Sequence, residues 1–538
     1  MPTLKINGRE VTVEKGMTIL NAAKSVGIKI PHFCYQADLS IAGNCRICLV
    51  EVEKAPKLQT ACSTEVADGM VVHTATEKVI VARRAIMEFL LINHPLDCPI
   101  CDQAGECKLQ DYSVKHGDAK SRFTEEKVKS VKREILGPHV IYDGERCIKC
   151  TRCIRFCEEI TKTNELAMFF RGDRSTIGIF PGVELTNDYS GNVVDLCPVG
   201  ALTLREFRFQ ARVWDLTEVD TICAACARGC NVIAGVKDGR IKRLTPRLNR
   251  QVNGNWMCDH GRLSYEALYD EERLAYPEIR IAKAGQEKGV AGELTRMVWK
   301  EALDASARKL DEILRAHGSG AVLFVILTFI TNEDAFIVSR FMKDVFPDAF
   351  ASVPLIERGE DDSLLIRKDK TPNRRGVGEI LKAASVKIVG LDEAFNIMKD
   401  GRVKAVVVLG DGMGGSYRSD ALKALRTDKT VFSLLAGSFR FDYARSFDAL
   451  LPAAAWAETE GTFTNFEGFV QRISPAIFPF KQSRPLWQIV QELGARMGSV
   501  HDLRSASAVF ERLSGEVPAF QGMHYRELKK QEARLKGA

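Results

Sequence analysis

The sixteen cysteines of this chain lie in its first half, and their spacing constrains the fold more than any other feature. Each lies at or before Cys258, and the 280 residues that follow contain none. Fifteen of them, completed by His94, form four groups with the spacing of metal ligands. The groups are Cys34, Cys45, Cys48 and Cys62; His94, Cys98, Cys101 and Cys107; Cys147, Cys150, Cys153 and Cys197; and Cys223, Cys226, Cys230 and Cys258. An electron relay needs several redox centres and a catalyst needs one, so four such groups predict a row of iron–sulfur clusters.

Length and composition indicate a soluble chain of several domains. The 538 residues are enough for about three to five domains. The longest apolar run, residues 321–330, is too short to cross a bilayer and predicts a buried strand. The first residues alternate like a strand, so we expect no signal peptide. In a reducing cytoplasm, closely spaced cysteines indicate metal ligands rather than disulfides.

The formal net charge of +6 gives no support to a nucleic-acid partner. Thiols that bind metal are deprotonated, and four clusters would add about −7, which leaves the loaded protein near neutral. The basic stretch at 367–375 is interrupted by Asp369 and Pro372, which favours a solvated loop.

The first group follows the sequence order of a β-grasp ferredoxin. Asn7-Gly8 predicts a tight hairpin turn, and Thr18 predicts the cap of a helix that ends at Gly27. Cys34, Cys45, Cys48 and Cys62 are then expected to hold a [2Fe–2S] cluster, with Gly43 allowing close backbone approach. A structural zinc site is the alternative.

The second group contains a histidine. An amphipathic segment at 79–91 precedes it and is expected to dock it on the first domain. His94 lies one helical turn before Cys98 and completes a set that otherwise has three ligands. A neutral imidazole in place of a thiolate raises the potential of a [4Fe–4S] cluster. A Cys3His zinc site is the alternative here.

The third group resembles half of a two-cluster ferredoxin. The run from Cys147 to Cys157 should have a partner run that ends at Cys197-Pro198. At the three positions where that partner run would need its other cysteines, the sequence has Asn187, Ser190 and Val193. One [4Fe–4S] cluster is therefore predicted, with Cys157 left as a core thiol. The fourth group is complete, and a [4Fe–4S] cluster is favoured there over zinc.

Residues 1 to about 260 resemble the G-subunit family of bacterial NADH-quinone oxidoreductase, respiratory complex I, in a short form. The resemblance rests on the ligand groups and on the segments CIKCTRCIRFCEEI, RGDRSTIGIFPG and YSGNVVDLCPVGAL. It implies that electrons enter from an NADH/FMN-binding subunit at the Cys34 cluster, pass to the Cys147 cluster and then the His94 cluster, and leave for a two-cluster ferredoxin-type subunit. It also implies other peripheral-arm partners, attachment to the membrane only through partners, and a place on the cytoplasmic side of the bacterial inner membrane. The Cys223 cluster would be a side site.

The rest of the chain resembles the molybdopterin oxidoreductases more loosely. The segments KTPNRRG and EGTFTNFEGFVQR carry this resemblance, although Phe469 stands where arginine is more usual. We expect no molybdopterin, because no cysteine follows Cys258 to ligate the metal; serine ligation stays open. Gly410, Gly412 and Gly415 spell a dinucleotide loop between a strand and a helix at 420–425. The next strand ends in Gly437-Ser438 without the acidic residue that binds ribose, which disfavours NADH.

The predicted fold class is multidomain α+β and α/β. The expected domains are a β-grasp [2Fe–2S] ferredoxin at 1–77, a His/Cys cluster domain at 78–117, a ferredoxin-like [4Fe–4S] domain at 138–215, a molybdopterin-oxidoreductase-type [4Fe–4S] domain at 216–272 and a truncated molybdopterin-oxidoreductase-like α/β domain at 273–538. The leading hypothesis is an electron-relay subunit with one [2Fe–2S] and three [4Fe–4S] clusters and no catalytic residues of its own. The alternative is a relay subunit of a soluble NAD-linked hydrogenase, formate dehydrogenase or electron-bifurcating complex. A third hypothesis is a zinc-stapled structural protein.

Overall fold

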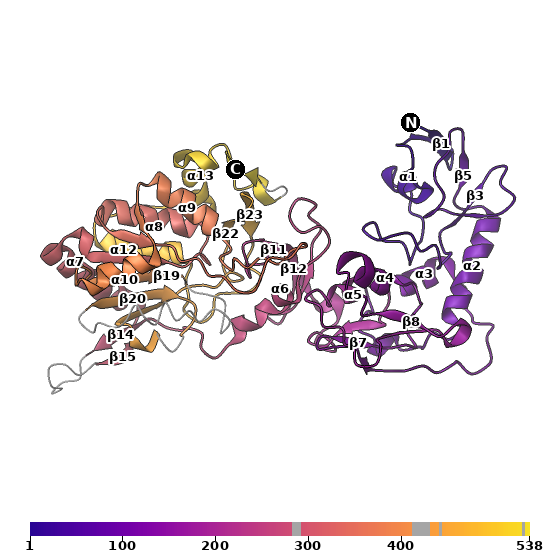
Figure 1. Ribbon diagram of the computed structural model, residues 1–538, viewed down its shortest axis with the longest axis horizontal. Coiled ribbons are helices and arrows are strands. Elements are labelled where there is room, and N and C mark those ends of the chain that lie inside the picture. Colours follow the sequence, from indigo (N-terminus) through magenta and orange to yellow (C-terminus); the bar gives the residue numbers. More distant parts are fainter. Residues whose placement is uncertain (282–291, 411–430, 441–443, 530–532, 538) are drawn as a thin grey trace. The chain divides into compact units, whose positions relative to one another are not determined.

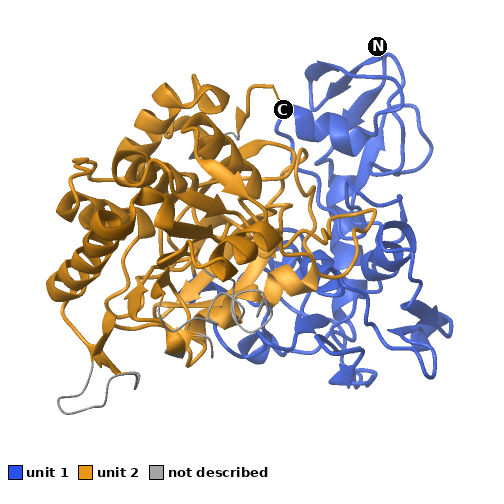
Figure 2. Ribbon diagram, turned by 60° about the vertical axis from the view of Figure 1, so that its left-hand side comes forward, with its two compact units in different colours: residues 1–216 blue, residues 217–538 orange. Residues whose placement is uncertain are grey.

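The computed structural model describes residues 1–281, 292–410, 431–440, 444–529 and 533–537. The chain divides into two compact units, residues 1–216 and 217–538 (Figures 1 and 2). Unit 1 is described without a gap. Among the described residues, no helix has both the length and the apolar character to cross a membrane.

Unit 1 begins with a five-stranded sheet. In pairing order, its strands are β2 (Arg9–Thr12), β1 (Thr3–Ile6), β5 (Val71–His73), β3 (Leu49–Val52) and β4 (Gln59–Thr60). β1 and β2 form the predicted hairpin, in which Asn7 and Gly8 both have positive φ. Helix α1 (Ile19–Ser25) shares a core with the sheet, and the Thr18 hydroxyl accepts a hydrogen bond from the Asn21 N–H at 3.4 Å. The predicted hairpin and helix cap are therefore confirmed.

Two helices carry the second group. Helix α2 (Glu77–Leu91) buries Met87 and packs against β3, as its amphipathic pattern predicts. Helix α3 (Lys108–His116) places the Tyr112 ring 5.1 Å from the Phe33 ring, measured between centroids. His94 lies beyond α2 on irregular backbone, so its spacing from Cys98 does not form the helical turn that the sequence suggested. Pro95 accounts for this, because the residue before a proline avoids helical backbone.

The rest of unit 1 carries the third group on small elements. A three-stranded sheet and a hairpin are accompanied by two short α-helices and a π-helical turn. These are β6 (Glu134–Ile135), β7 (Val140–Tyr142), β10 (Leu202–Leu204), β8 (Ala167–Phe169), β9 (Thr176–Gly178), α4 (Arg152–Arg155), the π-turn Phe156–Ile160 and α5 (Asn192–Leu196). β7 lies between β6 and β10.

Unit 2 begins with the elements that carry the fourth group. β12 (Asn231–Lys237) pairs antiparallel with β11 (Thr217–Ile222) and β13 (Arg240–Pro246), and helix α6 (Asp259–Leu263) follows. A second small sheet pairs β23 (Phe469–Ile473) with β22 (Gly461–Thr464) and β24 (Ala533–Arg534).

In the described part of unit 2, the central sheet has eight strands. In pairing order these are β15 (Glu293–Arg296), β14 (Glu278–Ile281), β21 (Ala449–Pro452), β20 (Phe432–Gly437), β19 (Ala405–Leu409), β16 (Val322–Ile326), β17 (Phe350–Ser352) and β18 (Lys387–Val389). From β21 to β18 neighbouring strands are parallel, and the chain order reverses between β16 and β19. This is a doubly wound α/β sheet.

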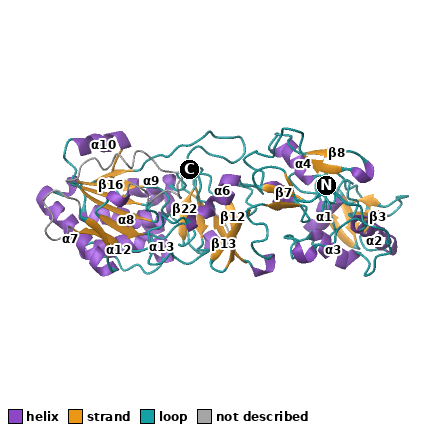
Figure 3. Ribbon diagram, turned by 90° about the horizontal axis from the view of Figure 1, so that it is seen from below, coloured by secondary structure: helices purple, strands orange, loops and turns teal. Residues whose placement is uncertain are grey.

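Helices cover both faces of this sheet. One core contains α7 (Trp299–His317), α8 (Asn332–Val345), α9 (Arg374–Ala383), α12 (Leu486–Arg496) and α13 (Ala506–Glu516). The other contains α10 (Leu391–Lys399), and Figure 3 shows α10 and α12 on opposite sides of β16. In β16, Phe324 joins the first core while Leu323 and Val325 join the second. β16 ends at Ile326, so it is shorter than the run of residues 321–330 predicted as a strand.

The predicted dinucleotide loop is described only at its start. Gly410 follows β19 with a φ of +81°, and a Cβ there would lie 2.6 Å from the Leu327 carbonyl oxygen. Gly412, Gly415 and the predicted helix at 420–425 lie outside the described residues.

Glu333 near the start of α8 should make the stability of unit 2 depend on pH. Its carboxylate accepts hydrogen bonds from the Thr462 N–H at 2.8 Å and the Thr462 hydroxyl at 3.1 Å. Burial raises the pKa of Glu333 from 4.5 to about 8. Because the pKa of Glu333 is higher in the folded state than in the unfolded state, its contribution to the free energy of unfolding is fully present below pH 4.5. That contribution is lost as the pH rises toward 8.

Between pH 5 and pH 8, the free energy of unfolding of the native chain should therefore fall with pH more steeply than that of Glu333→Gln. We expect the two slopes to differ by up to about 1.4 kcal/mol per pH unit. Urea unfolding of the full chain at several pH values measures this slope. Asp392→Asn, at the corresponding exposed position of α10, is the control and should leave the slope unchanged. An equal slope in Glu333→Gln and the native chain would contradict the assignment.

Candidate metal centres

The first group, here called the Cys34 site, is assembled from two segments. Cys34, Cys45 and Cys48 lie on the loop between α1 and β3, and Cys62 follows β4. The sulfur atoms of Cys48 and Cys62 are 3.4 Å apart, and the Cys34 N–H donates to the Cys45 sulfur at 3.4 Å. Hydrogen bonds from Cys45 and Cys62 lower the pKa of the Cys34 thiol. The fold therefore gathers all four thiols.

The second group, the His94 site, gathers its three cysteines at the start of α3. Cys98 and Cys101 flank a short turn, and Cys107 is the N-cap residue of the helix. Burial, followed by the charges of Arg146 and Lys127, lowers the pKa of His94 to about 4. The imidazole is thus neutral at pH 7, which is the form that binds metal. The Arg146 charge also opposes the rise that burial causes in the pKa of Cys101, so His94 and Cys101 lie within reach of the same guanidinium group.

The third group, the Cys147 site, has two buried cysteines, Cys150 and Cys153, and two half-buried ones, Cys147 and Cys197. Burial raises the pKa of Cys147, Cys150 and Cys197 to about 11. The thiolates of Cys150, Cys147 and Cys197 add to the effect of burial on Cys153. The fold therefore brings the four predicted ligands together from the loop before α4, α4 itself and the end of α5.

The fourth group, the Cys223 site, lies where β11 ends and β12 begins. The Cys223 N–H donates to the Cys230 carbonyl oxygen at 2.8 Å. Cys258 is the N-cap residue of α6, and its sulfur accepts from the Gly261 N–H at 3.3 Å. A Cβ at Gly261 would lie 3.0 Å from the Cys223 sulfur, so glycine permits this close approach. Burial raises the pKa of Cys226, as it does for the other three thiols.

In the half of the ferredoxin-like segment that lacks ligand cysteines, the Glu165 carboxylate accepts several hydrogen bonds. Glu165 accepts from the backbone N–H groups of Thr186 and Asn187, each at 3.0 Å, from the Asn187 side-chain amide, and from the Thr163 hydroxyl at 2.7 Å. Cys157 lies in the π-helical turn, where burial and then the Glu165 charge raise its pKa to about 12. Cys157 is therefore a buried thiol in its neutral form, and its exclusion from the cluster ligands stays a prediction.

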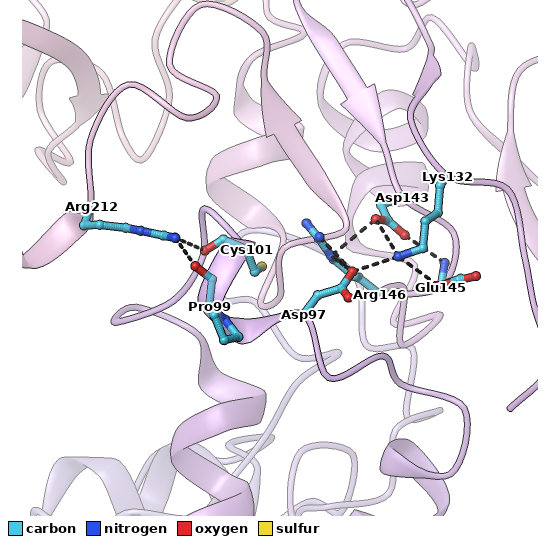
Figure 4. Close-up of polar contacts among 8 residues, drawn as sticks. All are labelled: Asp97, Pro99, Cys101, Lys132, Asp143, Glu145, Arg146 and Arg212. Carbon is cyan, nitrogen blue, oxygen red and sulfur yellow. Dashed lines mark hydrogen bonds and ion pairs between the residues drawn. The ribbon is translucent and has the colours of Figure 1, made fainter.

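The Cys147 site and the His94 site meet in unit 1. The loop after Cys197 passes over the Cys101 sulfur so closely that a Cβ at Gly200 would overlap it. Arg146, next to Cys147, donates to Asp97, next to Cys98, at 2.9 Å (Figure 4).

Further ion pairs and hydrogen bonds hold the loops around the His94 site. Lys132 binds Asp97 at 2.8 Å and Glu145 at 3.0 Å. On the other side of the His94 site, Arg212 donates to the carbonyl oxygens of Pro99 and, at 2.9 Å, Cys101 (Figure 4). The ligand loops are therefore tied to neighbouring segments on both sides.

The donor sets fit iron–sulfur clusters by their chemistry and surroundings. Burial opposes thiolate formation at nearly every cysteine, so metal binding at these sites requires a cation to replace the proton. Buried arginine Nε atoms without a protein acceptor lie near two of the sites, at Arg83 and Arg152, and an anionic cluster would satisfy them. In the described residues, no three His, Cys, Asp or Glu side chains are arranged for a single metal ion.

Sequence reasoning missed the buried arginines around these sites. Arg83, Arg152 and Arg155 are less than one-tenth exposed. Arg152 and Arg155 interleave with the cysteines of CIKCTRCIRFC, which was the available signal. Glu165 was also missed, because nothing local marks its carboxylate as the partner of a loop twenty residues away.

Family models match most of the chain. A model described as 2Fe-2S iron-sulfur cluster binding domain matches residues 1–77, NADH-ubiquinone oxidoreductase-G iron-sulfur binding region matches 83–122, and NADH-quinone oxidoreductase subunit 3, ferredoxin-like domain, matches 137–203. Molybdopterin oxidoreductase Fe4S4 domain matches 216–270, and Molybdopterin oxidoreductase matches 273–354 and 372–496.

Curated relatives carry related names. The NADH-quinone oxidoreductase G subunit of Rickettsia bellii is 42% identical over 313 residues, which is 58% of this chain and 44% of that protein. The NADH-ubiquinone oxidoreductase 75 kDa subunit of Reclinomonas americana is 39% identical over 365 residues, 67% of this chain and 51% of that protein. The chain thus spans about half the length of the relatives it matches. A solved NAD+-reducing [NiFe]-hydrogenase matches 39% of this chain and 91% of its own at 25% identity, with a TM-score of 0.34.

Gly200→Ala should disrupt the His94 site. The added methyl group would overlap the Cys101 sulfur and would lie 3.2 Å from the Gln103 Cβ, so the Cys101 loop must shift. We expect the purified variant to lose about one [4Fe–4S] equivalent of iron and acid-labile sulfide, with the spectra of the other clusters kept. Gly378→Ala in α9, where nothing lies within 4 Å of the new Cβ, is the control. Full iron content with unchanged electron paramagnetic resonance (EPR) spectra in Gly200→Ala would refute this contact.

Proposed function

We propose that this chain, which is similar to the G subunits of NADH-quinone oxidoreductases, belongs to that family and carries electrons from an NADH/FMN-binding subunit toward quinone. Its partners would be that flavin protein, a two-cluster ferredoxin-type subunit and other peripheral-arm subunits. It would lie on the cytoplasmic side of the bacterial inner membrane and reach the membrane only through partners. We propose no catalytic residue of its own.

The observation that carries this proposal is the linkage of three ligand groups within unit 1. The Cys147 site contacts the His94 site through Gly200 and the pair of Arg146 with Asp97. It also contacts the Cys34 site, because Arg155 donates to carbonyl oxygens of Cys34 and Cys150. A central Cys147 site supports the order Cys34 site, Cys147 site, His94 site.

We propose the four ligand groups as one [2Fe–2S] site and three [4Fe–4S] sites. When bound, these clusters would accept and release single electrons. The residues of the chain bury most of the ligand thiols, donate backbone hydrogen bonds to sulfur and hold the loops in place. The Lys149 N–H, for example, donates to the Cys147 sulfur at 3.4 Å. Such hydrogen bonds and burial set cluster potentials.

The C-terminal region is proposed as a scaffold without molybdopterin, and the Cys223 site as a side site. The large apolar cores of the central sheet support a stable scaffold. We also propose the domain division 1–77, 78–117, 138–215, 216–272 and 273–538; the family-model ranges and the sheet boundaries support it.

Cys150→Ala should separate NADH oxidation from quinone reduction. Removing one ligand of the central site should abolish NADH-to-quinone transfer in the isolated complex, because no path around that site is proposed. NADH oxidation by an artificial acceptor at the flavin should stay within about twofold of the native rate. Cys157→Ala is the matched control, since Cys157 lies on the same segment and is proposed to bind no cluster. Unimpaired quinone reduction in Cys150→Ala would overturn the relay.

The proposed partners should co-purify with the chain. We expect an anaerobic pull-down of the tagged chain in gentle detergent to recover flavin-binding, ferredoxin-type and membrane subunits, as identified by mass spectrometry. The native chain should carry iron and sulfide without molybdenum or tungsten. Recovery of soluble hydrogenase or dehydrogenase subunits in place of membrane subunits would keep the relay and refute the quinone-reducing complex.

A further inference from the structure

A buried arginine joins the loops of the Cys34 site and the Cys147 site. Arg155 is 7% exposed. Its guanidinium donates to the Cys34 carbonyl oxygen at 2.6 Å and to the Cys150 carbonyl oxygen at 3.4 Å. It also donates to the Ser40 carbonyl oxygen. One side chain on α4 therefore touches a proposed ligand residue of each site.

A second arginine repeats this bridge one turn earlier. Arg152 is 5% exposed, and it donates to the Leu196 carbonyl oxygen at 3.2 Å and to the Tyr35 carbonyl oxygen. Leu196 and Tyr35 are the chain neighbours of Cys197 and Cys34. Both guanidinium groups thus contact the loop that carries Cys34, which lies more than a hundred residues from α4 in the sequence. Their other contacts are Cys150, before α4, and Leu196, at the end of α5.

The charges of the two arginines require a counter-charge. Among the described residues of unit 1, the nearest carboxylate contact is indirect: Glu159 accepts from Ser40, whose carbonyl oxygen accepts from Arg155. A buried cation without a direct partner is strongly unfavourable. The Nε of Arg152 also has no acceptor among the described residues. The loops that the two guanidinium groups contact carry proposed thiolate ligands of both sites.

We propose that Arg152 and Arg155 are positioning residues that clamp the Cys34 and Cys147 sites together and supply positive charge shared by both clusters. This inference rests on the proposed relay function and deepens it. Arginine suits the role because its planar fork can donate in several directions while its charge stays fixed. Lysine would keep the charge but could not reproduce the fork.

The shared charge has a consequence for electron transfer between the two sites. One electron leaves the reduced [2Fe–2S] cluster, which is oxidised, and enters the oxidised [4Fe–4S] cluster, which is reduced. No bond forms or breaks, and no proton moves. The negative charge remains beside the same two cations before and after the step. Both reduced states are stabilised, so the arginines raise both midpoint potentials.

Redox titration of the intact complex, followed by EPR, tests the proposal. Arg155→Gln removes the charge while keeping hydrogen-bonding capacity. It should lower both midpoint potentials by about 59 mV, which corresponds to an about tenfold weaker stabilisation of each reduced cluster for one electron. Arg155→Lys should restore both potentials for the most part. Arg152→Gln should act in the same direction as Arg155→Gln.

Arg83→Gln is the matched control. Arg83 is equally buried, donates to the Leu49 carbonyl oxygen at 2.9 Å and lies near Cys48, on the Cys34 site alone. It should shift the [2Fe–2S] potential only. Unchanged potentials in Arg155→Gln, a shift of one cluster only, or equal shifts in the Gln and Lys variants would overturn the shared charge. Absence of either cluster from the native complex would instead overturn the proposed ligand sets.

Discussion

The structure of unit 1 is built around buried thiols, which bind metal only as thiolates. Burial raises the pKa of thiols such as Cys153 and Cys197, so each thiolate needs compensation from its surroundings. The chain supplies backbone N–H donors and buried guanidinium groups. The secondary structure around the sites is sparse, and long loops carry most ligands. We infer that metal binding contributes much of the free energy that orders these loops, because ligand sets of this kind couple binding to folding.

Unit 2 is held together differently. Its central sheet is covered on both faces, and alternate residues of β16, β19, β20 and β21 enter separate apolar cores. A sheet of this kind derives much of its stability from hydrophobic burial. The fourth cysteine group lies on a small antiparallel sheet of the same unit.

A buried carboxylate holds the half of the ferredoxin-like segment that lacks ligand cysteines. Glu165 collects several hydrogen bonds from the loop at Thr186 and Asn187, where the sequence pattern lacks ligands. A buried carboxylate with that many donors is well compensated. The nearby Cys157 stays protonated, so it carries no competing charge. The loop that leads to α5 and Cys197 is thereby fixed by protein hydrogen bonds alone.

The sequence by itself determined the features that depend on neighbouring residues: the ligand spacings, the Asn7-Gly8 turn, the Thr18 cap and the amphipathic α2. It also indicated the classes of the domains. It did not reveal that Pro95 keeps His94 off a helix, although the proline was visible. Only the tertiary structure decided that Arg155 reaches Cys34 and that Gly200 faces Cys101. The physical reason is that hydrogen-bonding and steric preferences act between neighbours along the chain, whereas contacts across a hundred residues are set by how separately folded segments pack.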